Sequence, residues 1–188
     1  MHEHALPVAP LWPALVNLNA HRVLLDVGGG SGTHSVAAVE SAPGLSAVIL
    51  EVHSMARCAE RAVAERGLKE RIRVVAGDMF HGDWPEADLH LLADVLHDWR
   101  PETARGLVRK SFAALPPGGR LALLEMPLAE GDGPLPEVLA SSLAMLLTVG
   151  GQQYTLAELK GFLSGAGFTR LEAHSVDGLW SLVTGRKP

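Results

Sequence analysis

Short apolar runs of strand length alternate along most of the chain with longer stretches in which apolar and polar residues are mixed. The apolar runs lie within residues 23–27, 47–52, 72–78, 87–95 and 120–127. The mixed stretches between them predict helices at 31–41, at 54–66 with Ser54 as N-cap, and at 101–115. A regular alternation of strands and helices is typical of an α/β fold with a mostly parallel sheet.

The pattern changes after the fifth apolar run. Pro134 and Pro136 precede a strongly apolar stretch, LASSLAMLLTV at 139–149, which predicts a helix in the core. Thr155 is placed to cap a further helix that reaches Ser164. Two more helices are therefore expected before the chain returns to strands.

Two apolar segments, within 168–176 and 179–186, are the last predicted strands. They are joined by Asp177 and Gly178, a pair that favours a tight hairpin in which both turn residues have positive φ. The last strand is therefore expected to run antiparallel to its neighbour, in a sheet of seven strands.

The first apolar run ends in a glycine-rich turn, VLLDVGGGSG at 23–32, which contains Asp26, Gly28 and Gly30. Because glycine has no side chain, a ligand can approach the backbone of such a turn closely, although the turn can also be purely structural. A strand, a glycine-rich turn and a helix in this order hold nucleotide-sized ligands at the carboxyl edge of an open α/β sheet. The dinucleotide spacing G-x-G-x-x-G is absent, because Thr33 stands at the third glycine position.

Acidic residues follow the next two predicted strands. Glu51 at the second strand end can accept two hydrogen bonds from a ribose diol, or it is a solvated strand-end glutamate. Asp78 after the third strand can accept from an exocyclic amine, while Met79 and Phe80 can flank a flat adenine ring or serve as core side chains of a turn. A ligand with a sulfonium, a ribose and an adenine would meet all the acids at these strand ends.

Size and composition narrow the classes of function. The 188 residues suit one domain, and 47% hydrophobic with 20% charged residues is typical of a globular protein. The net charge of -5 argues against a nucleic acid partner, which requires a basic face. No apolar run approaches a membrane span and no secretory signal is recognisable, so we expect no membrane contact and a cytoplasmic location. The single Cys58 is expected to be an inert thiol.

Six motifs stand in one order from about Val23 to the end of the sequence. They are LLDVGGGSG, the acid at Glu51, GDMF, LHDW, PPGG before LLE, and GGQQYT. In this order they resemble the small-molecule O-methyltransferases of the plant caffeate and hydroxyindole type, and the histidine of LHDW is the most specific feature. The resemblance implies a Rossmann-like class I methyltransferase fold, S-adenosylmethionine as cofactor, and methyl transfer to a hydroxyl of a small aromatic or polyketide-like molecule.

The resemblance also assigns catalytic roles. It makes His97 the general base that takes the proton of the acceptor hydroxyl, and histidine suits this role near pH 7. Two acids of the family orient that histidine. One corresponds to Glu125, and the other corresponds to Gln153, which carries no charge to favour the imidazolium. Asp98 and Trp99 are expected to fix the turn and pack against the following helix.

The binding residues follow from the same motifs. The cofactor is expected to contact Asp26, Gly28, Gly30, Glu51, Val52, Asp78, Met79, Phe80 and Ala93. At Ala93 the family often has lysine or arginine. One face of the helix at 139–149 lines the acceptor pocket in the family, with Ala144 and Thr148 at matching positions. No metal site is expected, because the histidines other than His97 share no metal-ligand spacing; the terminal ones are His2 and His4, and those expected at the surface are His21, His34, His53, His81, His90 and His174.

Relatives carry an N-terminal winged-helix-like domain that mediates dimerisation and covers the acceptor site, whereas here residues 1–20 form only an extension before a catalytic domain at 21–188. The chain is therefore either a catalytic domain cut from a longer protein or a minimal form with an open acceptor site, and its oligomeric state is left open. A degenerate domain that binds cofactor or a protein partner without turnover is the rival interpretation. A nicotinamide dehydrogenase is disfavoured by the glycine spacing and the terminal hairpin.

Overall fold

The computed structural model describes residues 5–129 and 136–188, which contain a seven-stranded sheet with the order β3-β2-β1-β4-β5-β7-β6. All neighbouring strands are parallel except β7, which is antiparallel to both β5 and β6. This confirms the predicted α/β fold with a mostly parallel sheet and an antiparallel terminal hairpin. The strands are β1 (Val23–Val27), β2 (Ser46–Glu51), β3 (Ile72–Ala76), β4 (Leu89–Ala93), β5 (Arg120–Glu125), β6 (Thr169–Ser175) and β7 (Ser181–Arg186).

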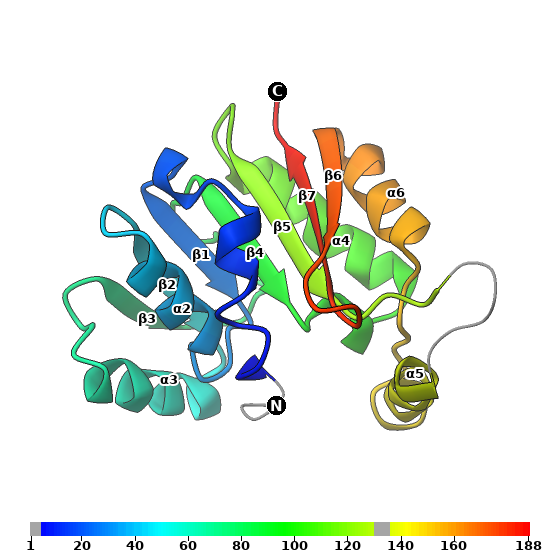
Figure 1. Cartoon of the computed structure of the whole chain (residues 1–188), viewed down its shortest axis with the longest axis horizontal. Helices are drawn as coiled ribbons and strands as arrows, with labels where there is room; N and C mark the ends of the chain where they lie inside the picture. The colour runs from blue at the N-terminus through cyan, green and yellow to red at the C-terminus, as the bar shows by residue number, and fades with distance from the viewer. Residues whose placement is uncertain (1–4, 130–135) are drawn as a thin grey trace.

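Helices cover both faces of the sheet (Figure 1). Successive residues of β1 point to opposite faces, so that Leu24 packs with the helices on one side and Leu25 with those on the other. The first side holds α2 (Thr33–Ser41) and α3 (His53–Glu65), and the second holds α4 (Pro101–Ala114) and α6 (Leu156–Ala166). The strands β1, β2, β4 and β5 are buried on both faces, which explains why they appear as uninterrupted apolar runs in the sequence.

The segment before β1 belongs to the same core. It contains the short helices η1 (Trp12–Leu15) and η2 (Leu18–Ala20). Four of its side chains are buried against α2 and the sheet: Val8, Trp12, Val16 and Leu18. The residues predicted as an extension thus share a hydrophobic core with the rest of the domain.

Two local predictions require correction. Ser54 does not cap α3, because the helix already begins at His53 and Val52 occupies the N-cap position. Only Gly178 of the hairpin turn has a positive φ, while the Asp177 side chain accepts hydrogen bonds from the backbone of Leu179 and Trp180. The hairpin is therefore closed by a longer loop than the predicted two-residue turn, although its strand pairing is as expected.

The C-terminal helix has the predicted boundaries, and the first long helix begins slightly later than predicted. Thr155 caps α6 in a complete capping box with Glu158, and Gly167 ends that helix in the left-handed conformation. Helix α2 begins at Thr33, two residues later than expected, because Gly32 has a φ of 78° and cannot be part of an α-helix.

Helix α5 (Pro136–Thr148) is not the core helix that its composition predicts. It stands apart from the sheet in Figure 1, and only Val138 is buried on it. Leu143, Leu146 and Leu147 are 57%, 60% and 76% exposed. Pro134, expected to open this helix, lies outside the described residues. None of the helices in the described ranges is both long enough and apolar enough to cross a membrane.

Candidate active site

The glycine-rich turn lies where the strand order reverses, between β1 and β4. In open α/β sheets this switch point at the carboxyl ends of the strands is where ligands bind. Gly28 has a φ of 69°, and its backbone N–H donates to the carbonyl of Leu50 on β2. The conformation favours glycine, and a Cβ at Gly28 would also crowd the Val95 side chain at 3.2 Å.

Two pockets meet at Gly28. The first, which we call the Glu51 pocket, has a volume of about 310 Å³ and is lined by Gly28, Leu50, Glu51, Val52, Gly77, Asp78, Met79, Phe80 and Trp99. The second, the Asp94 pocket, has a volume of about 60 Å³ and is lined by Ala5, Gly28, Gly29, Gly30, Ser31, Thr33, His34, Met55, Ala93 and Asp94. All predicted cofactor residues except Asp26 therefore line one of two adjoining pockets.

The acids of the Glu51 pocket are fixed by backbone donors. Glu51 accepts from the N–H of Gly30 at 2.9 Å and from the N–H of Val52 at 2.7 Å. Asp78 accepts from the N–H of Phe80 and pairs with the His81 ring, and these hydrogen bonds lower the pKa of the Asp78 carboxyl. Each carboxylate oxygen retains a second lone pair for a ligand.

Asp26 lies below the turn rather than in a pocket. Its carboxyl group is fully buried and accepts a 2.7 Å hydrogen bond from the Ser35 hydroxyl of α2. Burial raises the pKa of Asp26 to about 6, against the lowering effect of the Ser35 hydrogen bond. The structure therefore gives Asp26 a position that supports the turn and no contact with either pocket.

Trp99 is a pocket residue that sequence reasoning assigned to turn packing. It lines the Glu51 pocket and packs edge-to-face on Phe80, with ring centroids 4.7 Å apart. The Tyr154 hydroxyl donates to the Trp99 carbonyl, which fixes the backbone of this residue. The signal was present in the sequence, since an aromatic residue near a strand end can flank an adenine just as Phe80 can.

His97 lies in the short helix η3 (Leu96–Asp98) after β4, between Asp94 and Trp99, which line the two pockets. Its Nδ1 is 2.7 Å from Oε2 of Glu125, the last residue of β5. Both side chains are buried, and the backbone N–H groups of Val95 and Leu96 donate to Oε1 of the same carboxylate. With Nδ1–H donated to Glu125, the lone pair of the neutral ring is on Nε2.

Two further carboxylates surround His97, and the sequence analysis assigned neither of them to it. Asp94 Oδ1 is 3.7 Å from Nδ1, and Asp98 Oδ1 is 3.5 Å from Nε2. Burial lowers the pKa of His97, but the Glu125 hydrogen bond and the charges of Glu125, Asp94 and Asp98 outweigh it and raise this pKa to about 9. The histidine is thus a stronger base than free histidine.

Gln153 is fully buried but makes no hydrogen bond to His97 among the interactions of the described residues. Its amide nitrogen donates to Ser141 Oγ on α5, and its Oε1 has no partner there. The same segment supports His97 through the backbone: Gln152 N–H donates to the His97 carbonyl, and a Cβ at Gly151 would lie 2.0 Å from that oxygen. The GGQQYT motif therefore positions η3 instead of supplying an acid.

Ala144 and Thr148 lie on the exposed helix α5, where the Thr148 hydroxyl donates to the Ala144 carbonyl. Neither residue lines the Glu51 pocket or the Asp94 pocket. Their predicted contact with an acceptor remains a prediction.

Asp94, His97 and Glu125 bring their ligand atoms within 4.8 Å of one another, close enough to hold a metal ion. The sequence analysis joined Glu125 to His97 but did not place Asp94 with them, because the three residues come from two separate strand ends and the helix between them. The short hydrogen bond from His97 to Glu125 accounts for the same geometry without a metal.

The surface position expected for His34 and His90 is wrong, since both are buried. His90 shares a hydrogen bond with the Ser111 hydroxyl, and burial lowers its pKa to about 3. Burial also lowers the pKa of His34, to about 4. His2 and His4 lie outside the described residues.

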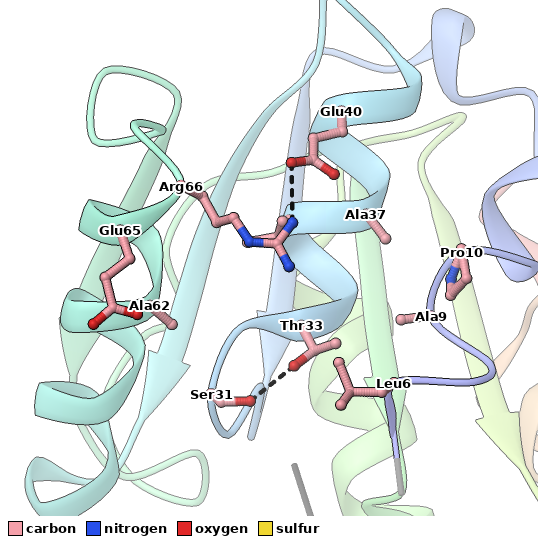
Figure 2. A pocket seen from close by; sticks show the side chains of 11 residues that line it. Leu6, Ala9, Pro10, Ser31, Thr33, Ala37, Glu40, Ala62, Glu65 and Arg66 are labelled. Carbon is pink, nitrogen blue, oxygen red and sulfur yellow. Dashed lines mark hydrogen bonds and ion pairs between the residues drawn. The ribbon is translucent and has the colours of Figure 1, made fainter. Parts of the chain in front are cut away.

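A further cavity of about 340 Å³ lies between α2, α3 and the segment before β1 (Figure 2). It contains none of the predicted site residues. Two of its charged side chains, Glu40 and Arg66, pair with each other at 3.4 Å, while Glu65 lines the α3 side, and the hydroxyls of Ser31 and Thr33 are 2.9 Å apart. With these groups directed at each other, the cavity shows no set of side chains converging on a ligand.

Comparison with known proteins finds one family whose sequence profile covers most of the chain, and relatives that cover most of it as well. The sequence profile of a family described as the O-methyltransferase domain matches residues 11–169. Acetylserotonin O-methyltransferase of Mus musculus molossinus is 36% identical over 162 residues, which are 84% of this chain and 42% of that protein. L-tyrosine C(3)-methyltransferase of Streptomyces lavendulae is 38% identical over 157 residues, which are 82% of this chain and 43% of that protein.

Solved structures share the fold as well. A crystal structure of an O-methyltransferase family 2 protein from Planctomyces limnophilus, in complex with apigenin, has a TM-score of 0.92 and 31% sequence identity. The match covers 100% of this chain and 59% of that chain. The chain thus spans less than half of these two curated relatives and about three fifths of this structure.

Proposed function

Since the chain belongs to the O-methyltransferase domain family, we propose that it transfers the methyl group of S-adenosylmethionine to a hydroxyl of a small aromatic or polyketide-like molecule, with His97 as general base. The observation that carries this proposal is the 2.7 Å contact between His97 Nδ1 and Glu125 Oε2, which leaves Nε2 as the proton acceptor. We further propose that residues 21–188 act as the catalytic domain, in the cytoplasm, without nucleic acid or membrane partners.

The two pockets fit the cofactor. Gly30 has a φ of 57° and open space where a side chain would stand, so the turn leaves room beside its backbone. Glu51 would accept from the ribose hydroxyls, Asp78 would accept from the adenine amine, and Phe80, held edge-to-face by Trp99, would pack against the ring. When bound, S-adenosylmethionine would supply an electrophilic methyl group, and breaking its carbon–sulfur bond would leave S-adenosylhomocysteine.

The protein's own task is to align the acceptor hydroxyl and remove its proton. A phenol with a pKa near ~10 is mostly neutral at pH 7. His97 Nε2 takes that proton as the hydroxyl oxygen forms its new bond, and Glu125 stabilises the resulting imidazolium. The relative that methylates a carbon of tyrosine shows that the family fold also serves another acceptor atom, so the choice of oxygen rests on the O-methyltransferase relatives.

The raised pKa of His97 predicts an alkaline pH profile. A general base must be neutral, and with a pKa of about 9 most molecules carry a protonated His97 at pH 7. We expect kcat/KM to rise about tenfold per pH unit from pH 7 and to level off near pH 9. A profile that is flat between pH 7 and 9, measured at saturating cofactor, would contradict this assignment.

Direct binding tests the cofactor site. By calorimetry we expect S-adenosylhomocysteine to bind the wild-type chain, and Glu51→Ala to weaken it by roughly tenfold to hundredfold, because hydrogen bonds to a charged group contribute ~1.5–3 kcal/mol. Glu70→Ala is the matched control, since Glu70 is exposed and lines neither pocket. If Glu51→Ala and the wild type bound S-adenosylhomocysteine with equal affinity, the assignment of Glu51 to the ribose would be wrong.

A degenerate domain without turnover is the second candidate. Two observations favour it: Gln153 carries no charge at the position of the family's second acid, and the apolar side chains of α5 are exposed. Binding of S-adenosylhomocysteine without methylation of any compound in a panel of hydroxylated aromatics would support this candidate over the enzyme.

A further inference from the structure

One carbonyl group in the loop after β3 accepts hydrogen bonds from two side chains at once. The Met79 carbonyl accepts from the indole N–H of Trp84 in the same loop, at 2.9 Å, and from the ammonium group of Lys110 on α4, at 2.8 Å. Trp84 is buried, and the Lys110 nitrogen lies 5.5 Å from the centroid of its ring, so the two donors also attract each other. The loop is thereby tied to a helix that covers the sheet.

His90 and Ser111 support Trp84 from the side of the sheet. The ring of His90 on β4 packs edge-to-face with the ring of Trp84, at a centroid distance of 5.5 Å. His90 Nδ1 is 2.9 Å from the hydroxyl of Ser111, which follows Lys110 on α4. Because burial lowers the pKa of His90 to about 3, this ring stays neutral at pH 7. The indole N–H therefore has a fixed direction toward the Met79 carbonyl.

Asp78 lies between two anchored peptide groups. On its N-terminal side, the N–H of Gly77 donates to the carbonyl of Glu51 on β2, at 2.9 Å. On its C-terminal side, the Met79 carbonyl is held by its two donors. The backbone at Asp78 is thus fixed before any ligand arrives, and a group that is already in place need not be ordered during binding.

We propose that Trp84 and Lys110 are positioning residues for the methyl donor: they hold the Met79 carbonyl so that the Asp78 carboxylate stays at the exocyclic amine of the adenine. Neither residue lines the Glu51 pocket itself. This inference rests on the proposed function, and it adds the residues that set the preference for a base carrying an amine. A hydrogen bond depends on direction, whereas the packing of Phe80 against the ring tolerates small shifts.

Calorimetry with two ligands tests the positioning. S-adenosylhomocysteine carries the amine, and its 6-deamino analogue has a hydrogen atom in that place. We expect the wild-type chain to bind S-adenosylhomocysteine about tenfold more tightly than the analogue, because the analogue makes no hydrogen bond to the carboxylate. In Lys110→Met the preference should fall to about twofold, with the affinity for the analogue within twofold of wild type. Methionine adapts to the space of the lysine stem and keeps a favourable contact with Trp84.

Two variants control for the loss of a charge and of a side chain. Arg109→Met removes a positive charge from the preceding position of α4, where Arg109 is exposed and lines neither pocket. We expect this variant to keep the tenfold preference. Lys110→Arg should recover a preference of about fivefold or more, because a guanidinium can donate to the same carbonyl and stack on the indole.

Trp84→Phe separates positioning from charge. The pKa of the Asp78 carboxyl is lowered by hydrogen bonds from Phe80 and His81 and also by the charge of Lys110, so Lys110 has a second way to act on Asp78. Phenylalanine keeps an aromatic ring beside the ammonium group and removes the indole N–H. We expect Trp84→Phe to lower the preference for S-adenosylhomocysteine over the analogue at least twofold.

The outcomes separate this inference from the proposed function. If the wild-type chain binds neither ligand, the proposed cofactor site is wrong, and the inference falls with it. If the wild type binds both ligands equally, Asp78 does not contact the amine, and the inference falls again. If Lys110→Met weakens both ligands equally, Lys110 stabilises the loop without positioning Asp78, and the inference alone is overturned. A reduced preference in Lys110→Met with the full preference in Trp84→Phe would show that Lys110 acts through its charge, and would overturn it too.

Discussion

Replacing His97 by glutamine is expected to lower kcat by roughly a thousandfold at pH 9, within the ~10²–10⁴ range of general-base catalysis. The glutamine amide can donate to Glu125 in place of Nδ1–H, so the buried carboxylate keeps a partner and the fold is retained. It has no basic nitrogen for the proton of the acceptor. The measurement is a single-turnover rate on a hydroxylated aromatic acceptor found by screening, together with the Kd of S-adenosylhomocysteine.

His174→Gln is the matched control, because His174 is exposed on β6 and lines neither pocket. We expect its rate and its cofactor affinity to equal those of the wild type. The base assignment would be wrong if His97→Gln kept more than about a tenth of the wild-type rate, since general-base catalysis contributes at least ~10²-fold. A loss of rate accompanied by an equal loss of cofactor affinity would instead point to a disturbed pocket.

The fold could be predicted because its determinants are local and periodic. The central strands are buried on both faces, so runs such as Leu24 and Leu25 are apolar without alternation, and glycine or proline marks the turns. Helix α5 was predicted in the core because an apolar composition does not reveal which surface covers it. Its exposed leucines show that the burial of an apolar helix depends on which other elements the tertiary structure packs against it.

Part of the site could also be predicted, because the order of strands and turns in the sequence places their ends in the sheet. Residues at the carboxyl ends of parallel strands converge at one edge of the sheet, so Glu51 and Asp78 were found from strand ends alone, whereas Glu125 was assigned through the family resemblance. Asp94 was missed although it follows β4 directly, because its relevance depends on a distance to His97 that spacing does not give. The buried position of His34 could not be predicted, since a polar residue in an amphipathic helix is ordinarily exposed.

Removing Glu125 should have the largest effect on stability. Glu125→Ala leaves the buried His97 ring without its hydrogen-bond partner and two backbone N–H groups, of Val95 and Leu96, without an acceptor. Breaking a buried charge pair in this way costs ~3–5 kcal/mol of unfolding free energy. We expect a loss of that size by chemical denaturation at pH 7, accompanied by loss of measurable turnover.

The pH dependence of the stability lost in Glu125→Ala identifies the cause of that loss. The folded pKa of His97, about 9, lies above its ordinary value of 6.5, so its contribution to stability is fully present below pH 6.5 and is lost as the pH rises through 9. In the variant, burial still lowers the pKa of His97 and the largest opposing contribution, that of Glu125, is gone, although Asp94 and Asp98 remain. The excess proton binding therefore falls, and the difference in unfolding free energy between wild type and Glu125→Ala should narrow by up to ~1.4 kcal/mol per pH unit between these values. Glu125→Gln separates the charge of Glu125 from its hydrogen bonds, because the amide oxygen still accepts from the backbone while the charge is gone.

The difference in unfolding free energy between wild type and Glu125→Ala could instead stay constant from pH 6.5 to 9. Glu125 would then contribute to the fold through its backbone hydrogen bonds and not through the pair with His97.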